Sequence, residues 1–148
     1  MIEYNAVEVN DKFNKLIKDL IKIITDTIGK NVLLESAKQK ISFILNADPF
    51  FLLENAGLYI YKYREIIKNG DFEDLIMNTE NYILSDDKSV LEDHTSKASS
   101  EEKSGFESII ISLRNSWSEY GKKEKKIIKK IITGLLSEYC KYQIIQQN

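Results

Sequence analysis

Aliphatic and aromatic residues fill most positions between Asp48 and Gly70, so this stretch leaves little room for a continuous polar face. A helix that is apolar nearly all round is normally a buried one, and we expect this helix to form the centre of the fold. Asp48-Pro49 is typical of a helix start, because Asp is a preferred cap and Pro suits the first turn. Asn69-Gly70 supplies the stop. Helix propensity weakens in the interior only at Asn55-Ala56-Gly57, where we expect a kink or a break.

Two helices are expected before the central one. The first starts near Asn10, which is a good cap, and ends at Gly29, with apolar residues at helical spacing between them. The second runs from about Asn31 to Asn46 and stops before Asp48-Pro49, because the residue before a proline avoids the α region. The turn between the second helix and the central helix is therefore very short.

Three further helices are expected after the central one. Residues 71–78 form a short helix after Gly70. Its inward face would carry Phe72, Leu75 and Ile76. The next helix begins at Ser104, because Ser104-Gly105-Phe106-Glu107 matches a capping box. After a turn at Tyr120-Gly121, the last helix runs to about Gln143 with one wide apolar stripe and one polar face. The last two helices are expected to form an antiparallel hairpin that packs against the first two.

The segment from Ser85 to Lys103 differs in composition, because almost nothing in it except Val90 and Leu91 is strongly apolar. Such a segment buries too little surface to offset the entropy of ordering it, so residues 85–103 are expected to be a polar loop or mobile linker. No segment alternates with period two, so no strand is expected. The sequence predicts an all-α fold: a compact single helical domain over residues 1–148, built as a bundle of five or six helices with one long polar loop.

Composition adds an expectation about location. The single cysteine, Cys140, excludes an internal disulfide, and no Asn-x-Ser/Thr sequon occurs. The first residues lack the basic charge and the apolar block of a signal peptide, and no apolar run approaches the roughly 18 residues that span a bilayer. We therefore expect a soluble protein of a reducing, intracellular compartment with no membrane contact. The formal net charge of −2 favours no particular class of ligand.

The sequence offers little support for catalysis or for a cofactor. A closed zinc site needs four ligands, mainly Cys and His, and this chain has one of each, Cys140 and His94. Cys140 lies on the apolar stripe of the last helix, where a buried thiol is expected, and His94 lies in the polar segment. Neither the P-loop spacing nor the dinucleotide fingerprint occurs. We expect a non-enzymatic protein with no catalytic residues, no metal site and no cofactor.

Lysines gather at the start of the last helix. They are Lys122, Lys123, Lys125, Lys126, Lys129 and Lys130. One interpretation is a face that binds the phosphates of nucleic acid without reading its sequence. Basic charge at a helix start opposes the helix dipole, which favours a functional reason for it. The other interpretation is a solvated polar face, because lysine is the usual polar residue of this chain and arginine, which reads phosphate better, is missing from the cluster. The solvated face is the preferred interpretation.

The aromatic residues give a weaker signal. Tyr59, Tyr61 and Tyr63 cannot form one stacking platform on a helix, because residues two apart point about 200° away from each other. We expect them to pack in the core with their hydroxyls reaching hydrogen-bond partners. Trp117 is expected to anchor the hairpin of the last two helices. If partly exposed, Trp117 would also be a natural contact for a partner protein.

Two stretches are similar to a known family. The central helix contains Leu58-Tyr59-Ile60-Tyr61-Lys62-Tyr63-Arg64-Glu65-Ile66-Ile67, followed by Asn69-Gly70-Asp71. Near the C-terminus, Trp117 precedes Lys122-Lys123-Glu124-Lys125 and an isoleucine-rich helix. Both stretches resemble small helical proteins of nucleocytoplasmic large DNA viruses, the giant viruses. The chain departs from the family pattern in its acidic loop and at Ile127 and Ile128, where an aromatic residue is common.

The resemblance implies a viral origin and a helical fold, and it assigns no activity and no site residues. The expected function is a non-enzymatic protein–protein interaction or structural module in the cytoplasm or nucleus of an infected host cell. Its partner would be a viral protein, a host protein or a second copy of the chain. The alternative is sequence-independent binding to the nucleic-acid backbone through the lysine face of the last helix.

Overall fold

The computed structural model describes residues 4–29, 31–69, 76 and 97–147, and every regular element within these ranges is a helix. The helices are α1 (Ala6–Ile28), α2 (Val32–Ala47), α3 (Phe51–Lys62), α4 (Arg64–Lys68), α7 (Lys97–Ser116), the short 3-10 helix η1 (Trp117–Glu119) and α8 (Lys122–Gln147). The expected all-α fold of five or six α-helices is therefore confirmed for the described part of the chain.

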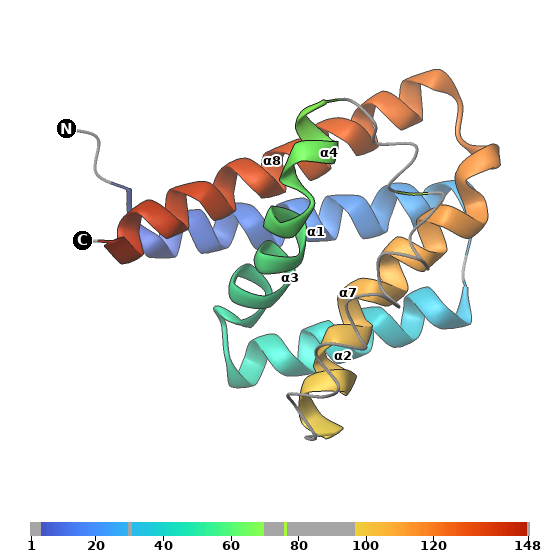
Figure 1. The fold of residues 1–148 in the computed structure, drawn as a ribbon. Helices are drawn as coiled ribbons and strands as arrows, with labels where there is room; N and C mark the ends of the chain where they lie inside the picture. The colour runs from blue at the N-terminus through green and yellow to red at the C-terminus, as the bar shows by residue number, and fades with distance from the viewer. Residues whose placement is uncertain (1–3, 30, 70–75, 77–96, 148) are drawn as a thin grey trace.

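The helices are arranged as two pairs with a bridge between them. Helix α8 lies along α1 in the opposite direction, so the start of α1 and the end of α8 lie at one end of this pair (Figure 1). Helix α7 crosses α2, and α3 lies across α1 and α8 (Figure 1). The two helices at the start of the chain therefore have separate partners, and α1 and α2 touch each other only slightly.

The core consists of aliphatic and aromatic side chains that these helices turn toward one another. The largest fully buried side chains are those of Phe13, Ile17, Leu20, Ile24, Leu34, Leu53, Ile76, Ile109, Leu113, Ile128 and Leu135. Ile76 is the one described residue of the helix expected over 71–78, and it is buried as expected. The remainder of that expected helix, including Phe72 and Leu75, lies outside the described residues.

Helix α1 begins four residues before the start expected at Asn10, so that expectation is wrong. Asn5 is the actual cap, and its Oδ1 accepts hydrogen bonds from the amides of Val7 and Glu8 at 2.9 and 3.3 Å. Asn10 is buried instead, and its Nδ2 donates to the Pro49 carbonyl oxygen at 2.9 Å. An asparagine that ties two segments together looks like a cap in the sequence, because both roles use the same side chain. Gly29 ends α1 as expected, with φ of 75°.

The central helix is shorter and differently interrupted than expected. It begins at Phe51, after a turn in which the Asp48 carboxylate accepts a hydrogen bond from the Phe50 amide at 3.2 Å. Asn55-Ala56-Gly57 lies in continuous helix, so the break expected there is wrong. The break occurs at Tyr63, where the chain leaves α3 and enters α4. Arg64 donates from Nη1 to the Tyr61 carbonyl oxygen at 3.0 Å, which satisfies an acceptor at the end of α3.

Gly57 is needed inside α3 for a reason unrelated to a break. A Cβ at this position would overlap the ring of Tyr139 on α8, with the Cγ only 2.8 Å away. The glycine therefore lets the two helices approach closely where α3 crosses α8. Its low helix propensity, which costs about 1 kcal/mol relative to alanine, is the smaller effect here.

The C-terminal helices also differ from the expectation. Helix α7 begins at Lys97, so Ser104 lies inside α7 and does not cap its start. The polar loop expected over 85–103 is therefore helical from residue 97, and its residues 85–96 lie outside the described part of the chain. Ala, Glu and Lys are good helix formers, and this propensity outweighs the low apolar content of the segment. The turn at Tyr120-Gly121 is confirmed, and α8 ends four residues later than expected, at Gln147.

The expected hairpin is wrong as an arrangement. Helices α7 and α8 diverge after η1, and they pack against α2 and α1 respectively (Figure 1). The expectation that both would pack against the first two helices is confirmed, but each packs against a different one. Consecutive helices joined by a short turn often pair. Here the apolar stripe of α8 is used by α1 and α3, so little of it is left for α7.

We predict that Gly57→Ala lowers the free energy of unfolding by about 1–3 kcal/mol, because the added methyl group would overpack the contact with Tyr139. Urea unfolding followed by circular dichroism measures this loss. Gly134→Ala on α8 is the matched control, since a Cβ there meets only the flexible end of Leu16, at 3.2 Å. An equal loss in a Tyr139→Leu background would contradict the explanation, because the smaller side chain removes the overlap.

Candidate interaction surfaces

The lysine face of α8 is exposed to solvent at five of its six expected residues. They are Lys122, Lys123, Lys126, Lys129 and Lys130. Lys122, Lys126 and Lys129 recur at helical spacing and so lie on one side of α8. None of the five forms an ion pair with another described residue. The sixth, Lys125, is half-buried, with its Nζ 5.0 Å from the centroid of the Trp117 ring.

Trp117 lies in η1 and only 5% of its surface is exposed. Its ring centroid is 6.0 Å from that of Tyr120, and Lys125 covers it from α8. The indole therefore anchors the connection between α7 and α8, as expected of a buried Trp. Little of its surface is left for contact with a partner protein.

The three tyrosines of the central segment pack inside the protein, as expected. Tyr63 is buried, and the rings of Tyr59 and Tyr63 meet edge to face with centroids 5.1 Å apart. Tyr59 meets Phe106 of α7 in the same way at 5.6 Å. Tyr61 packs against Tyr139 of α8 at 5.8 Å. These contacts join three helices and present no platform for nucleic-acid bases.

A groove of about 510 Å³ lies between α1 and α2, where those helices separate toward their different partners. Its apolar lining residues are Ile21 from α1 and Ile41 and Leu45 from α2. The polar residues that complete the lining are Lys18, Lys22, Thr25, Asp26, Lys38, Ser42 and Asn46. The groove thus has an apolar floor between two polar walls. We call it the α1–α2 groove.

The charges of the α1–α2 groove are mostly positive and are unevenly placed. Lys18 and Lys22 lie on the α1 wall and make no ion pair with another described residue. Lys38 on the α2 wall has its Nζ 3.7 Å from Oε1 of Glu35. Because α1 and α2 run in opposite directions from a short turn (Figure 1), the order of residues along each helix places Asp26 nearest the turn and Lys18 farthest from it. Lys22 and Lys38 lie between them at about equal distance from the turn, so the end of the groove away from the turn is the more basic.

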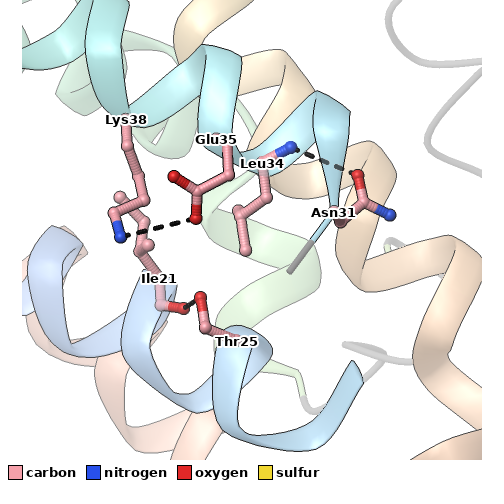
Figure 2. A network of polar contacts seen from close by, with 6 residues as sticks. All are labelled: Ile21, Thr25, Asn31, Leu34, Glu35 and Lys38. Atoms are coloured by element: carbon pink, nitrogen blue, oxygen red, sulfur yellow. Dashed lines mark hydrogen bonds and ion pairs between the residues drawn. The ribbon is translucent and has the colours of Figure 1, made fainter. Parts of the chain in front are cut away.

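The turn end of the α1–α2 groove is shaped by local hydrogen bonds. Figure 2 shows Lys38 and Glu35 extending from α2 toward α1, where Ile21 and Thr25 face them. The Thr25 hydroxyl donates to the Ile21 carbonyl oxygen at 2.9 Å, which keeps that hydroxyl on its own helix. Asn31 accepts from the Leu34 amide at 3.3 Å and so stabilises the start of α2 (Figure 2). Each wall of the groove is therefore a helix that is stabilised by hydrogen bonds within itself.

Beyond the α2 wall of the groove, α2 carries exposed apolar side chains. Phe43 is 76% exposed and Val32 is 88% exposed. Val32, Ser36, Gln39 and Phe43 follow one another at spacings of four, three and four, so they form one stripe along the outer side of α2. An aromatic residue this exposed costs solvation energy, and such residues are enriched at protein contacts.

The sequence alone does not reveal the α1–α2 groove. Ile21 and Ile41 are largely buried, as apolar residues at helical spacing usually are, so their pattern resembles that of ordinary core residues. The groove lies between two helices that pack mainly against different partners, α8 and α7, and these contacts are distant in sequence. One signal was available: Phe43 falls outside the apolar stripe of its helix, where an aromatic residue has no role in the core.

The described residues contain no cluster of three or more His, Cys, Asp or Glu side chains that could hold a metal ion. Cys140 is half-buried and packs against the core, less deeply than expected. Within the described ranges, none of the helices has the length and apolar content needed to cross a membrane.

Comparisons of the chain with protein-family models, with curated proteins and with solved structures find no match.

Beside Trp117, the Tyr120 hydroxyl lies 2.8 Å from Ser116 Oγ, which itself donates to the Ser112 carbonyl oxygen at 2.7 Å. Burial raises the pKa of Tyr120 above its usual value of 10.0, more than the Ser116 hydrogen bond lowers it. Burial likewise raises the pKa of Tyr139 and of Tyr142. A tyrosine pKa that is higher in the folded state means that the folded protein holds the proton more tightly. The stability that these raised pKa values contribute is fully present at pH values below the pKa of tyrosine in the unfolded chain. It is lost as the pH rises through the higher pKa of the same tyrosine in the folded protein.

We predict that the protein loses stability as pH rises above about 10, where tyrosine ionises in an unfolded chain. In Tyr120→Phe the alkaline loss should be smaller, because one of the shifted groups is gone. Urea unfolding at a series of alkaline pH values tests this. Absorbance of tyrosinate provides the control: the difference titration between wild type and Tyr120→Phe should have its midpoint above 10. A midpoint at the pKa of free tyrosine would contradict the role of burial.

Proposed function

We propose that this protein is a helical protein–protein interaction module and that the α1–α2 groove is its contact surface. The observation that carries the proposal is the apolar floor of Ile21, Ile41 and Leu45, open between two helical walls. An amphipathic helix commonly binds such a groove by placing its apolar face on the floor. The exposed Phe43 beyond one wall extends the apolar surface that a bound partner could cover.

The length of the groove supports this mode of binding. The lining residues run from Lys18 to Asp26 on α1 and from Lys38 to Asn46 on α2. The first and last Cα atoms of such a nine-residue stretch of helix lie about 12 Å apart, so the groove offers room for about two turns of a partner helix. Two turns present three or four apolar side chains on one face, which matches a floor of three apolar residues.

Viral origin stays a prediction that rests on the resemblance of residues 58–71 and 117–125, and an intracellular location stays a prediction that rests on composition. Both are compatible with an interaction module and add no residue to its surface. The family has no assigned activity, so the resemblance supports no enzymatic function. That the protein is non-enzymatic is therefore part of the proposal.

We predict that Ser42→Trp blocks the α1–α2 groove, because Ser42 is an exposed lining residue where a large side chain fills the groove without entering the core. The test is a selection from a library of helix-forming peptides randomised on both faces. Peptides enriched on the wild-type protein should lose binding to Ser42→Trp by about tenfold or more, which corresponds to about 1.4 kcal/mol.

Ser137→Trp is the matched control for this selection, since Ser137 is an exposed serine on the polar side of α8, away from the groove. Enriched peptides should bind this variant as they bind wild type. Peptides that bind Ser42→Trp unchanged would show that the groove is not the contact surface. Circular dichroism of both variants verifies that the helices are retained.

A second function is favoured by one specific observation, the five exposed lysines of α8 without ion-pair partners among the described residues. Such a face can neutralise phosphates and release counterions, which gives binding that weakens steeply with salt. Arginine, which reads phosphates and bases better than lysine, is missing from the face, and this favours binding that is independent of base sequence. We therefore keep nucleic-acid backbone binding as the alternative.

For this alternative, Lys122→Glu/Lys126→Glu should abolish binding to single-stranded and duplex DNA at about 50 mM salt, while wild type should bind and lose orders of magnitude in affinity by about 200 mM. Fluorescence anisotropy of labelled oligonucleotides measures both. Lys12→Glu/Lys15→Glu is the control, because it changes two exposed lysines of α1 and shifts the net charge equally. No binding of wild type at low salt would eliminate the alternative.

A further inference from the structure

The α1–α2 groove distinguishes among partner helices by charge as well as by shape. Three of its lining residues are lysines, and one, Asp26, is acidic. Lys18 and Lys22 are exposed on the α1 wall, one helical turn apart, and neither pairs with another described residue. Both residues line the groove beside its apolar floor. A bound helix would therefore place the side chains that flank its apolar face next to these two charges.

The α2 wall of the groove also favours acidic side chains on a bound helix, but less strongly than the α1 wall does. Lys38 borders the floor from α2 and is already engaged by Glu35 at 3.7 Å. Ser42 and Asn46, which follow Lys38 along this wall, are polar and uncharged. An occupant with acids on both flanks would meet lysine on the α1 side and hydrogen-bond donors on the α2 side. A basic occupant would be repelled by Lys18 and Lys22, whose charges no described residue neutralises in an ion pair.

From this charge arrangement we propose that the groove binds an acidic amphipathic helix of a partner protein. The inference rests on the proposed function and adds the chemistry of the partner. The bound segment carries apolar residues at spacings of three and four on one face and Asp or Glu on the flanks. Its acidic residues concentrate at the end that lies over Lys18 and Lys22, because Asp26 lies nearest the turn. The asymmetry thus fixes which end of the bound helix, the acidic one, lies away from the turn.

The probe for this inference is a fluorescein-labelled, helix-stabilised peptide of about 14 residues, long enough to exceed the two turns of the groove. It carries three leucines on one face and glutamates on the flanking positions. Two companion peptides replace every glutamate by glutamine or by lysine. Wild type should bind the glutamate peptide most tightly and the lysine peptide most weakly. Affinity for the glutamate peptide should fall between about 50 and 300 mM salt as screening increases.

Variants of the protein locate the charge effect. Lys18→Glu/Lys22→Glu should weaken the glutamate peptide by about tenfold or more, because it turns two attractions into repulsions. The same variant should bind the lysine peptide better than wild type does. Lys12→Glu/Lys15→Glu is the matched control, with the same change in net charge on exposed positions of α1 that do not line the groove. It should change the affinity by less than about twofold, as expected of charges outside the contact.

Each other outcome overturns the inference in a recognisable way. If the glutamine peptide binds as tightly as the glutamate peptide, and Ser42→Trp abolishes both, the groove is a contact surface but not one for acidic helices. If no peptide depends on Ser42, the proposed function fails as well. If both double variants weaken binding equally, the attraction comes from net charge rather than from the groove.

Two other occupants are separated by direct measurement. Sedimentation of the protein alone would reveal a dimer, and a dimer dissociated by Lys18→Glu/Lys22→Glu would identify a second copy of the chain as the occupant. Flotation with vesicles of phosphatidylcholine and phosphatidylglycerol tests an anionic membrane surface. Vesicle binding that this variant abolishes, with no binding of the glutamate peptide, would assign the groove to lipid. The inference expects a monomer and no vesicle binding that depends on Lys18 and Lys22.

Discussion

The antiparallel packing of α8 on α1 is the constraint on which the other helices depend. It joins the beginning and the end of the chain and uses the apolar side of α1 that carries the fully buried Phe13, Ile17, Leu20 and Ile24. Helix α2 follows α1 after a short turn but cannot cover the same side, so its own apolar side packs against α7. The α1–α2 groove is the geometric result, because two neighbouring helices are held by different partners.

Helix α3 connects these two pairs, and its contact with α8 depends on a missing side chain. Gly57 leaves the space that the Tyr139 ring occupies. The same region is strengthened by the Tyr142 hydroxyl, which donates to Glu54 Oε1 at 3.0 Å, and by the ring of Phe50, which stacks on Tyr142 at 6.4 Å. Helix α3 also touches α1 and α2, so it packs against both helices that border the groove as well as against α8.

The helical class and most helix positions could be predicted from sequence, because periodicity and Gly29 report local structure. Properties that depend on distant contacts could not. Asn10 resembled a cap but binds the Pro49 carbonyl, and Gly57 resembled a break but accommodates Tyr139. For the candidate surfaces, the lysines of α8 were visible as a cluster of charge. The α1–α2 groove was not, because no local pattern specifies which helix covers another.

The two basic surfaces of this protein differ in what surrounds their lysines, and that difference separates their chemistry. On α8 the five exposed lysines adjoin the polar residues Thr133 and Ser137, and the nearest exposed apolar side chain, Ile127, is only 40% exposed. Such a face can hold phosphates, which require charge alone. Lys18 and Lys22 instead border an apolar floor. A ligand gains affinity for the α1–α2 groove only if it offers apolar area and negative charge together. An acidic amphipathic helix combines both on one face.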